Sequence, residues 1–525
     1  MSIKRLQKAL AYAVSVVLAL AVLTYITGGV MVRRKVAQAV AQLPPSLKVS
    51  YSSLHPLLFQ SALVIKNLDI RFAPGDSAHA HHVRIAKVEL AGIGFFSWLS
   101  SRRLKIKTLL LEDGRVDIDR SLLDSGALPH DLQRPFTEAA IGKILLVNIQ
   151  VNRGAGFTAT GDLEIDSVHI DSTVAFSGIS CHISNARYRY PDAYAQLRLS
   201  GLDIDSRERT LDIDTVRIVP TVDKLELGKI KGHQEDFVEG DATGIHVGGL
   251  DFGELRRAAA AGSHPAGAPH RFVADKVTIK GARVYVFRDR RLPLDTGVKP
   301  LPVDYLRRLP VDLRVQKAEL GPTTFTYEEH PKDGDKTGYL KIVHFSGHID
   351  HLINHPAPGD PAYMNVVTEG SLMGSGSVEA TTRMPLRPGD PYIVNGSFHD
   401  LDVTSLNPAA ENLGRLHLES GLLNNLSFSF QMTAEKATGQ IIGEYHNLVA
   451  DKLKDVDDKK VDKFKSFFLK HLIIPKDKDH TLPVARRTGK VDYKRDHSRY
   501  FSYYLLHSLL VGVKGSFSLG FLLPG

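Results

Sequence analysis

The apolar residues of the chain follow a repeated pattern in which strict alternation slips once by one residue and then resumes. In "LDIDTVRI" the apolar positions are Leu211, Ile213, Val216 and Ile218, and polar residues stand between them. Alternation of this kind predicts a β-strand with one buried face. The slip predicts a β-bulge, because a bulge absorbs the extra residue and keeps the second apolar pair on the face of the first. A tight corner between two short strands would also explain the slip.

The same pattern recurs along the chain at irregular intervals, which argues against a solenoid with a fixed repeat length. We predict a mainly β protein: a long, twisted, bulge-rich antiparallel sheet with one apolar face and a few short helices. Looser copies of the pattern lie at 104–111 and 272–279. The residues predicted to share the apolar face are Leu63, Ile65, Leu68, Ile70, Val83, Ile85, Val88, Leu90, Leu163, Ile165, Val168, Ile170, Leu197, Leu199, Leu202, Ile204, Leu211, Ile213, Val216, Ile218, Leu313, Val315 and Leu320.

The N-terminus contains an uncharged apolar segment, residues 9–32, with basic residues on both sides. It is long enough to cross a bilayer, so residues 1–42 are predicted to form a transmembrane anchor. The alternative is a cleaved signal peptide, since "AQA" at 37–39 resembles a cleavage site, although the apolar segment exceeds a typical signal core. Both interpretations carry the rest of the chain across the membrane and leave the short N-terminal tail in the cytoplasm.

The clearest linker in the composition is the segment 258–270, which contains Gly, Pro and His residues. We therefore expect residues 43–257 and 271–450 to form two parts of the sheet. Residues 451–525 are expected to form an amphipathic helix followed by an apolar terminal segment. The apolar face of that helix consists of Val461, Phe464, Phe468 and Leu472, and it either packs on the sheet or lies on a membrane surface.

Charge and reactive residues narrow the classes of function. The net charge of +8 is diffuse, which suits an anionic membrane surface and does not suggest nucleic-acid binding. Cys181 is the single cysteine, so neither an internal disulfide nor a cysteine zinc site is expected. His348, His351 and His355 could share a helical face, but no carboxylate pattern of a metalloenzyme accompanies them. We expect no catalytic residue, metal or cofactor, and hence no enzyme.

An apolar sheet face must be covered by something. Two such faces could pack on each other as β-sandwiches. Alternatively, a bent open sheet could hold acyl chains on its concave apolar face while the charged face meets water. The residue pattern alone leaves both interpretations open.

The first 120 residues resemble the AsmA-like family of Gram-negative envelope proteins. In that family a basic anchor precedes a strand like "LVIKNLDI" (63–70), and further strands follow in a degenerate pattern. Similar positions here are 88–90, 98–99, 104–111 and 116–118, and the segment "YFSYYLLHSLLVGVKGSF" (500–517) resembles the end of a shorter AsmA-like subgroup. The resemblance implies an inner-membrane anchor and a periplasmic β-groove, related in design to bridge-like lipid transfer proteins.

The implied activity is passive movement of phospholipid between the inner and outer membranes, which maintains the outer membrane. The apolar positions above would line the groove, and the family contributes no catalytic residue. The expected partners are phospholipid, the inner membrane and an outer-membrane or other envelope protein, without nucleic acid. The alternative is a non-enzymatic scaffold or chaperone-like factor for outer-membrane protein assembly, which would act through sheet edges or loops.

Overall fold

A computed structural model describes residues 47–57, 60–72, 81–93, 103–118, 138–154, 156–171, 174–190, 194–253, 270–452 and 485–517. These residues are mainly β-strand, and the sheet is mixed and not closed on itself. The chain falls into a first unit, Met1–Val216 with Val247–Ala268, and a second unit, Arg217–His246 with Pro269–Gly525. The predicted anchor, the linker up to residue 269 and the predicted amphipathic helix lie outside the described residues. In the described part of the chain, no helix is long and apolar enough to cross a membrane.

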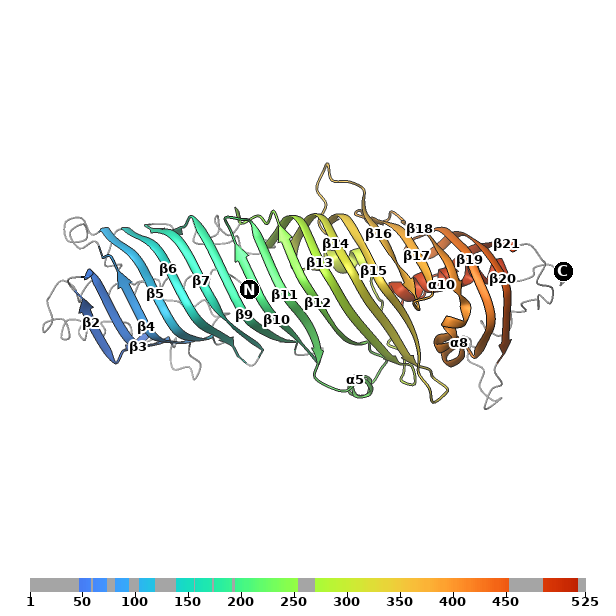
Figure 1. The fold of residues 1–525 in the computed structure, drawn as a ribbon, viewed down its shortest axis with the longest axis horizontal. Coiled ribbons are helices and arrows are strands. Elements are labelled where there is room, and N and C mark those ends of the chain that lie inside the picture. Colours follow the sequence, from blue (N-terminus) through green and yellow to red (C-terminus); the bar gives the residue numbers. More distant parts are fainter. Residues whose placement is uncertain are drawn as a thin grey trace. The chain divides into compact units, whose positions relative to one another are not determined.

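The first unit is built from strands that pair in chain order from β3 to β7, after which β9 pairs with β7 and β10 with β9 (Figure 1). Strands β1 and β2 both pair with β3, and the short β8 pairs with β7. The strands are β1 (Leu47–Ser50), β2 (Ser53–Leu57), β3 (Ala62–Phe72), β4 (His81–Ala91), β5 (Arg103–Ile118), β6 (Glu138–Arg153), β7 (Phe157–Ile170), β8 (Val174–Ala175), β9 (Gly178–Tyr190) and β10 (Ala195–Asp205). Strands β11 (Thr210–Pro220) and β12 (Phe237–Gly248) each run across the division between the units.

In the second unit, strands β13 to β21 pair in chain order (Figure 1). The strands are β13 (His270–Asp289), β14 (Val311–His330), β15 (Gly338–Ile353), β16 (Tyr363–Leu372), β17 (Gly376–Pro385), β18 (Tyr392–Asp402), β19 (Leu416–Met432), β20 (Lys436–Lys452) and β21 (Ala485–Lys494). The helices are α5 (Lys224–Lys231), α7 (Pro302–Arg307), the 3-10 helix η2 (Val403–Leu406), α8 (Asn407–Gly414) and α10 (Phe501–Phe517).

The prediction of an antiparallel sheet is wrong at two of the strand pairs whose register the structure describes. β5 and β6 are parallel, and so are β13 and β14. Between β13 and β14 the chain passes through residues 290–310, including α7, and so returns to the end of the sheet from which β13 started. Alternation of apolar and polar residues reports which face a side chain takes, but not the direction of the strand.

The slips in the apolar pattern lie within continuous strands, and in many pairs they occur on both strands together. β3 and β4 keep one register throughout, with Lys66 opposite Lys87 and Leu68 opposite Ile85. The slip residue Asn67 takes a left-handed backbone conformation with a φ of 51°. Because both strands slip at the same level, the apolar set of each returns to its own face without a change of register. We call these matched slips.

Matched slips continue across the first unit. Between β5 and β6, one such slip leaves Asp113 and Asn148 between registered pairs, with φ values of 53° and 54°. The side-chain amide of Asn148 donates a hydrogen bond of 2.7 Å to the carboxylate of Asp113, which fixes the two slips beside each other. Bulges that do shift the register, as predicted, occur between β6 and β7 and between β7 and β9. The expected bulges are therefore present, but matched slips are the additional way in which the pattern is accommodated.

Helix α10 packs on the apolar side of the last strands in the second unit. Tyr504 of α10 is 1% exposed and belongs to the same buried cluster as Tyr392, Ile441 and Val491. Gly489 of β21 allows this approach, since a Cβ on it would lie 1.8 Å from the carbonyl oxygen of Gly512 in α10. The sequence had suggested only an apolar terminal segment here, and the structure makes it a docked helix.

Candidate functional site

The predicted apolar positions on β3, β4 and the end of β7 form one buried cluster in the first unit. Their burial shows that the slip does keep both halves of each strand on the same face. The buried positions are Leu63, Ile65, Leu68, Ile70, Ile85, Val88, Leu90, Val168 and Ile170. Val83, Leu163 and Ile165 are partly buried and pack against this cluster.

The predicted positions on β10 and β11 are less completely covered. Those that are half-buried are Leu197, Leu199, Leu202, Ile204, Leu211, Ile213 and Val216. Ile218, at the end of β11, is 38% exposed. In the second unit Val315 is buried, whereas Leu313 and Leu320 are half-buried. The predicted residues therefore range from a closed core on β3 and β4 to an apolar surface that solvent reaches on β10 and β11.

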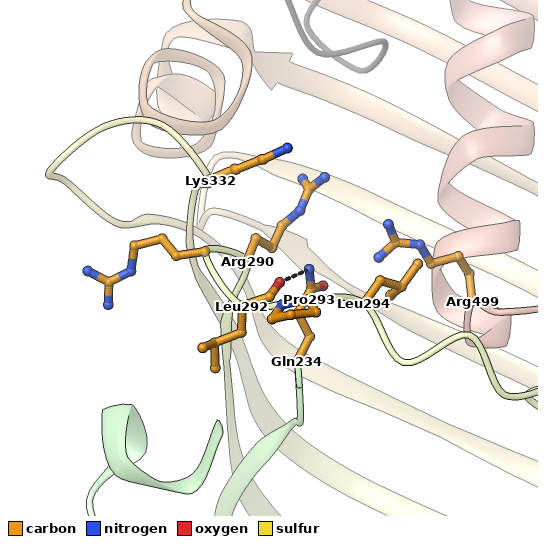
Figure 2. A pocket seen from close by; sticks show the side chains of 8 residues that line it. Gln234, Arg290, Leu292, Pro293, Leu294, Lys332 and Arg499 are labelled. Carbon is orange, nitrogen blue, oxygen red and sulfur yellow. Dashed lines mark hydrogen bonds between the residues drawn. The ribbon is translucent and has the colours of Figure 1, made fainter. Parts of the chain in front are cut away.

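A second feature, absent from the sequence-based predictions, is a cavity of about 350 Å³ in the second unit (Figure 2). Its lining includes the cations Arg290, Arg291, Lys332 and Arg499, and no carboxylate of the described residues lines it. Gln234 and the segment Leu292–Leu294 complete the wall. We call it the cationic cavity.

The parallel pairing of β13 and β14 brings these cations together. Asp289 is in register with His330, so the residues that follow each strand leave the sheet at the same edge. The backbone N–H of Arg290 donates to the carbonyl of His330 at 3.0 Å, which holds the two exits side by side. Arg499 precedes α10 and reaches the cavity from the side of that helix (Figure 2).

Two arginines of the cavity, Arg290 and Arg291, form ion pairs with carboxylates that do not line the cavity. Arg290 donates to Glu329 at 3.0 Å, and the phenol of Tyr327 donates to the other oxygen of Glu329 at 2.7 Å. Burial alone would lower the pKa of Arg290, but the carboxylate of Glu329 outweighs it and the pKa is raised. Arg291 donates to Asp289 at 2.7 Å. These guanidinium groups therefore stay charged and are positioned before any ligand binds.

Arg499 is less completely compensated by the protein. Its side chain is only 13% exposed, and its nearest ion-pair oxygen, on Asp496, is 3.9 Å from Nε. Within the described part of the chain, its buried Nε has no hydrogen-bond partner, and neither has the buried Oε1 of Gln234. Buried polar atoms are normally hydrogen-bonded, so these two atoms mark the cavity wall as incompletely satisfied.

His507 lies one helical turn beyond Tyr503 on α10, and burial lowers its pKa to about 4. A hydrogen bond to the Tyr503 carbonyl acts in the opposite direction, whereas the positive charges of Arg499 and Arg290 lower the pKa further. The folded pKa lies below the unfolded value, so the unfolded chain takes up a proton first as pH falls. The contribution of neutral His507 to the free energy of unfolding is therefore fully present near neutral pH. It is lost as the pH falls from about 6.5 to about 4.

We expect the free energy of unfolding to fall by about 2 kcal/mol between pH 6.5 and pH 4.5, because His507 must remain neutral in the folded state. Urea unfolding followed by tyrosine near-ultraviolet circular dichroism measures this change. His507→Phe keeps an aromatic ring beside Tyr503 and should remove this loss of stability. An equal loss of stability in the variant would assign the pH dependence to other groups.

The remaining sequence-based candidates do not form a site. His348 and His351 lie on strand β15 and His355 follows it, so these three residues do not share a helical face. Among the described residues, no group of His, Cys, Asp and Glu could hold a metal ion. Cys181 lies on β9, and burial raises the pKa of its thiol, which keeps it protonated.

The cationic cavity could have been suspected in part from "FRDRRLP", a dense charge cluster at the end of an apolar strand. Its partners Lys332 and Arg499 are far away in sequence. Only the parallel pairing of β13 with β14 and the docking of α10 bring them to the same place.

Comparison with known proteins gives no relative from which a role could be taken: no family model matches the chain, and no curated protein matches it significantly. The function therefore has to be argued from the apolar face and the cationic cavity.

Proposed function

We propose that this protein is a membrane-anchored periplasmic carrier that moves phospholipid passively between the inner and outer membranes and so maintains the outer membrane. The acyl chains would lie on the apolar face of its sheet. The proposal combines the resemblance of the first 120 residues to AsmA-like proteins with the surface properties of the first unit.

The observation that carries the proposal is the change in burial along one apolar face. The positions on β3 and β4 are closed off as a core, but Leu197, Leu199, Leu202 and Ile204 on β10 are only half-buried. Exposing several apolar side chains to water on one strand has a cost unless another apolar molecule covers them. Acyl chains would supply that cover without any specific polar contact.

Two tyrosines at the end of β9 fit the same use. Tyr188 and Tyr190 are each 41% exposed, and their rings meet edge to face at a centroid distance of 4.8 Å. Tyr188 is directly opposite Leu197 of β10 and is also in register with Phe157 of β7. Tyrosine suits a place where an apolar surface meets water, because its ring is apolar and its hydroxyl is polar.

The test is native mass spectrometry of the full chain released from detergent, with any bound phospholipid identified by mass. Leu199→Asp places a charge on the apolar face of β10 and should reduce lipid occupancy at least about fivefold. Ser200→Asp is the matched control, since it adds the same charge at an exposed position on the same strand. The control should retain lipid at the wild-type level.

Circular dichroism and thermal melting should show that both variants are folded, and Leu199→Ser serves as a milder substitution if Leu199→Asp is not. A wild-type chain that carries no lipid, under conditions in which a known carrier keeps its own, would contradict the proposal. That result would favour the alternative of an envelope scaffold or chaperone-like factor.

A further inference from the structure

We propose that the cationic cavity of the second unit binds a phosphate group, and that this phosphate belongs to the headgroup of a phospholipid. The phosphate site is argued from the cavity itself. Only its assignment to a lipid rests on the proposed function.

The chemistry of the wall selects a phosphate. Arg290 and Arg499 present planar guanidinium groups, which match the oxygens of a phosphate with paired N–H donors. Arg291, whose Nε and Nη2 already donate to Asp289, and the mobile Lys332 add positive charge. The carboxylates that pair with Arg290 and Arg291 are Glu329 and Asp289, and neither lines the cavity. An anion in the cavity would therefore contact the cations of the lining and not their carboxylate partners. A volume of about 350 Å³ accommodates a headgroup-sized ligand.

The wall contains buried polar atoms that the described residues leave without a hydrogen-bond partner and that a ligand could satisfy. A guanidinium as buried as that of Arg499 normally has a close anionic partner, but among the described residues its ion-pair carboxylate, on Asp496, lies 3.9 Å from Nε. Phosphate oxygens would supply the counter-charge at this end of the cavity. The buried Oε1 of Gln234, which has no hydrogen-bond partner among the described residues, would accept from the hydroxyl of a protonated phosphate or of a headgroup.

An apolar surface leads along the strands to the cations. Val284 and Val286 are two residues apart on β13, so both side chains lie on the same face, and both are half-buried. In the parallel register Val286 lies beside Tyr327, and Phe325 precedes Tyr327 on the same face of β14. Two residues beyond Tyr327 comes Glu329, which binds Arg290 of the cavity wall. On this face the apolar residues are followed by Arg288 and Glu329, and the cations of the cavity lie just beyond the strand ends. An amphiphile on this face would place its phosphate at that charged end.

The experiment uses the full chain in nanodiscs of neutral phosphatidylcholine, titrated by isothermal calorimetry with dihexanoyl phosphatidic acid and, separately, with inorganic phosphate. We expect Lys332→Gln to weaken binding of the lipid probe severalfold and Lys332→Gln/Arg499→Gln to weaken it at least about tenfold. Arg499→Lys, which keeps the charge but not the planar fork, should fall between wild type and Arg499→Gln. Lys336→Gln is the matched control, since Lys336 is exposed on the same loop but does not line the cavity.

Lys332 is exposed, so its substitution tests the cavity without threatening the fold. The phosphate site is overturned if neither probe binds saturably, or if Lys332→Gln/Arg499→Gln binds as the wild type does. Binding of phosphatidic acid about tenfold more tightly than inorganic phosphate supports a lipid headgroup, whereas equal affinities overturn that assignment in favour of free phosphate. A negative result for the phosphate site can be distinguished from a negative result for the proposed function. Lipid binding on the apolar face is tested separately, by the lipid occupancy of the Leu199→Asp variant in the first unit.

Discussion

Replacing Gly489 by valine should displace helix α10 from strand β21 and destabilise the second unit by on the order of 3 kcal/mol. A Cβ at this position would lie 1.8 Å from the carbonyl oxygen of Gly512 and 2.5 Å from the backbone nitrogen of Ser516. Both are backbone atoms of α10, so no change of side-chain rotamer relieves the overlap and the helix itself has to move. The buried Tyr504 would then lose its packing in the apolar cluster of the last strands.

Hydrogen–deuterium exchange of residues 501–517 measures the displacement directly, and thermal unfolding gives the loss of stability. Thr488→Val is the matched control, because Thr488 is the neighbouring residue on β21 and is exposed. We expect full amide protection of α10 in the control and little in Gly489→Val. Equal protection in both variants would mean that the helix docks by contacts other than this close approach.

Removing the carboxylate of Asp236 should cost about 3–5 kcal/mol of folding free energy, because it leaves the buried guanidinium of Arg288 without its partner. Arg288 donates to both oxygens of Asp236 at 2.7 Å, and its side chain is only 11% exposed. The ion pair joins the end of β13 to the segment before β12, and Arg288 also lies 5.5 Å from the ring centroid of Tyr500. Urea unfolding of Asp236→Ala against the wild type measures the loss.

A second ion pair, between β13 and β12, provides the control. Arg283 of β13 binds Asp241 of β12 at 2.9 Å, but Arg283 is 75% exposed, so Asp241→Ala should cost less than about 1 kcal/mol. The double variant Arg288→Met/Asp236→Leu, which replaces both charges by apolar groups, should recover most of the stability lost in Asp236→Ala. A similar loss at Asp236 and Asp241 would contradict a role for burial.

The sequence predicted the faces of the strands better than their directions. Leu63, Ile65, Leu68 and Ile70 share a buried face as expected, because alternation and its slip follow directly from the positions of apolar residues. The parallel pairs β5–β6 and β13–β14 were not predicted, since a strand has the same alternation whichever way it runs. Asn67 and Asp113 could be recognised in the sequence only as polar residues at a slip. Their left-handed backbone conformations could not be predicted from it.

The candidate site was predictable mainly in its apolar part. Half-burial of Leu199 could not be distinguished from full burial of Leu63, because both occupy the same place in the same pattern, and coverage depends on the rest of the fold. Of the cationic cavity, the sequence shows only the charge cluster around Arg290, since Lys332 and Arg499 are remote from Arg290 in the sequence and meet it only through strand pairing and helix docking.

The matched slips also constrain how such a chain changes over evolutionary time. Deleting Asn67 alone would turn Leu68 and Ile70 to the solvent side. The neighbouring strand β4 would keep its own slip, so the two strands would no longer match. A compensating deletion in β4 would in turn oppose the slip of β5, so a single-residue change is transmitted from neighbour to neighbour. Length variation in this protein should therefore be confined to loops or occur as the gain and loss of whole hairpins, each carrying its slips with it.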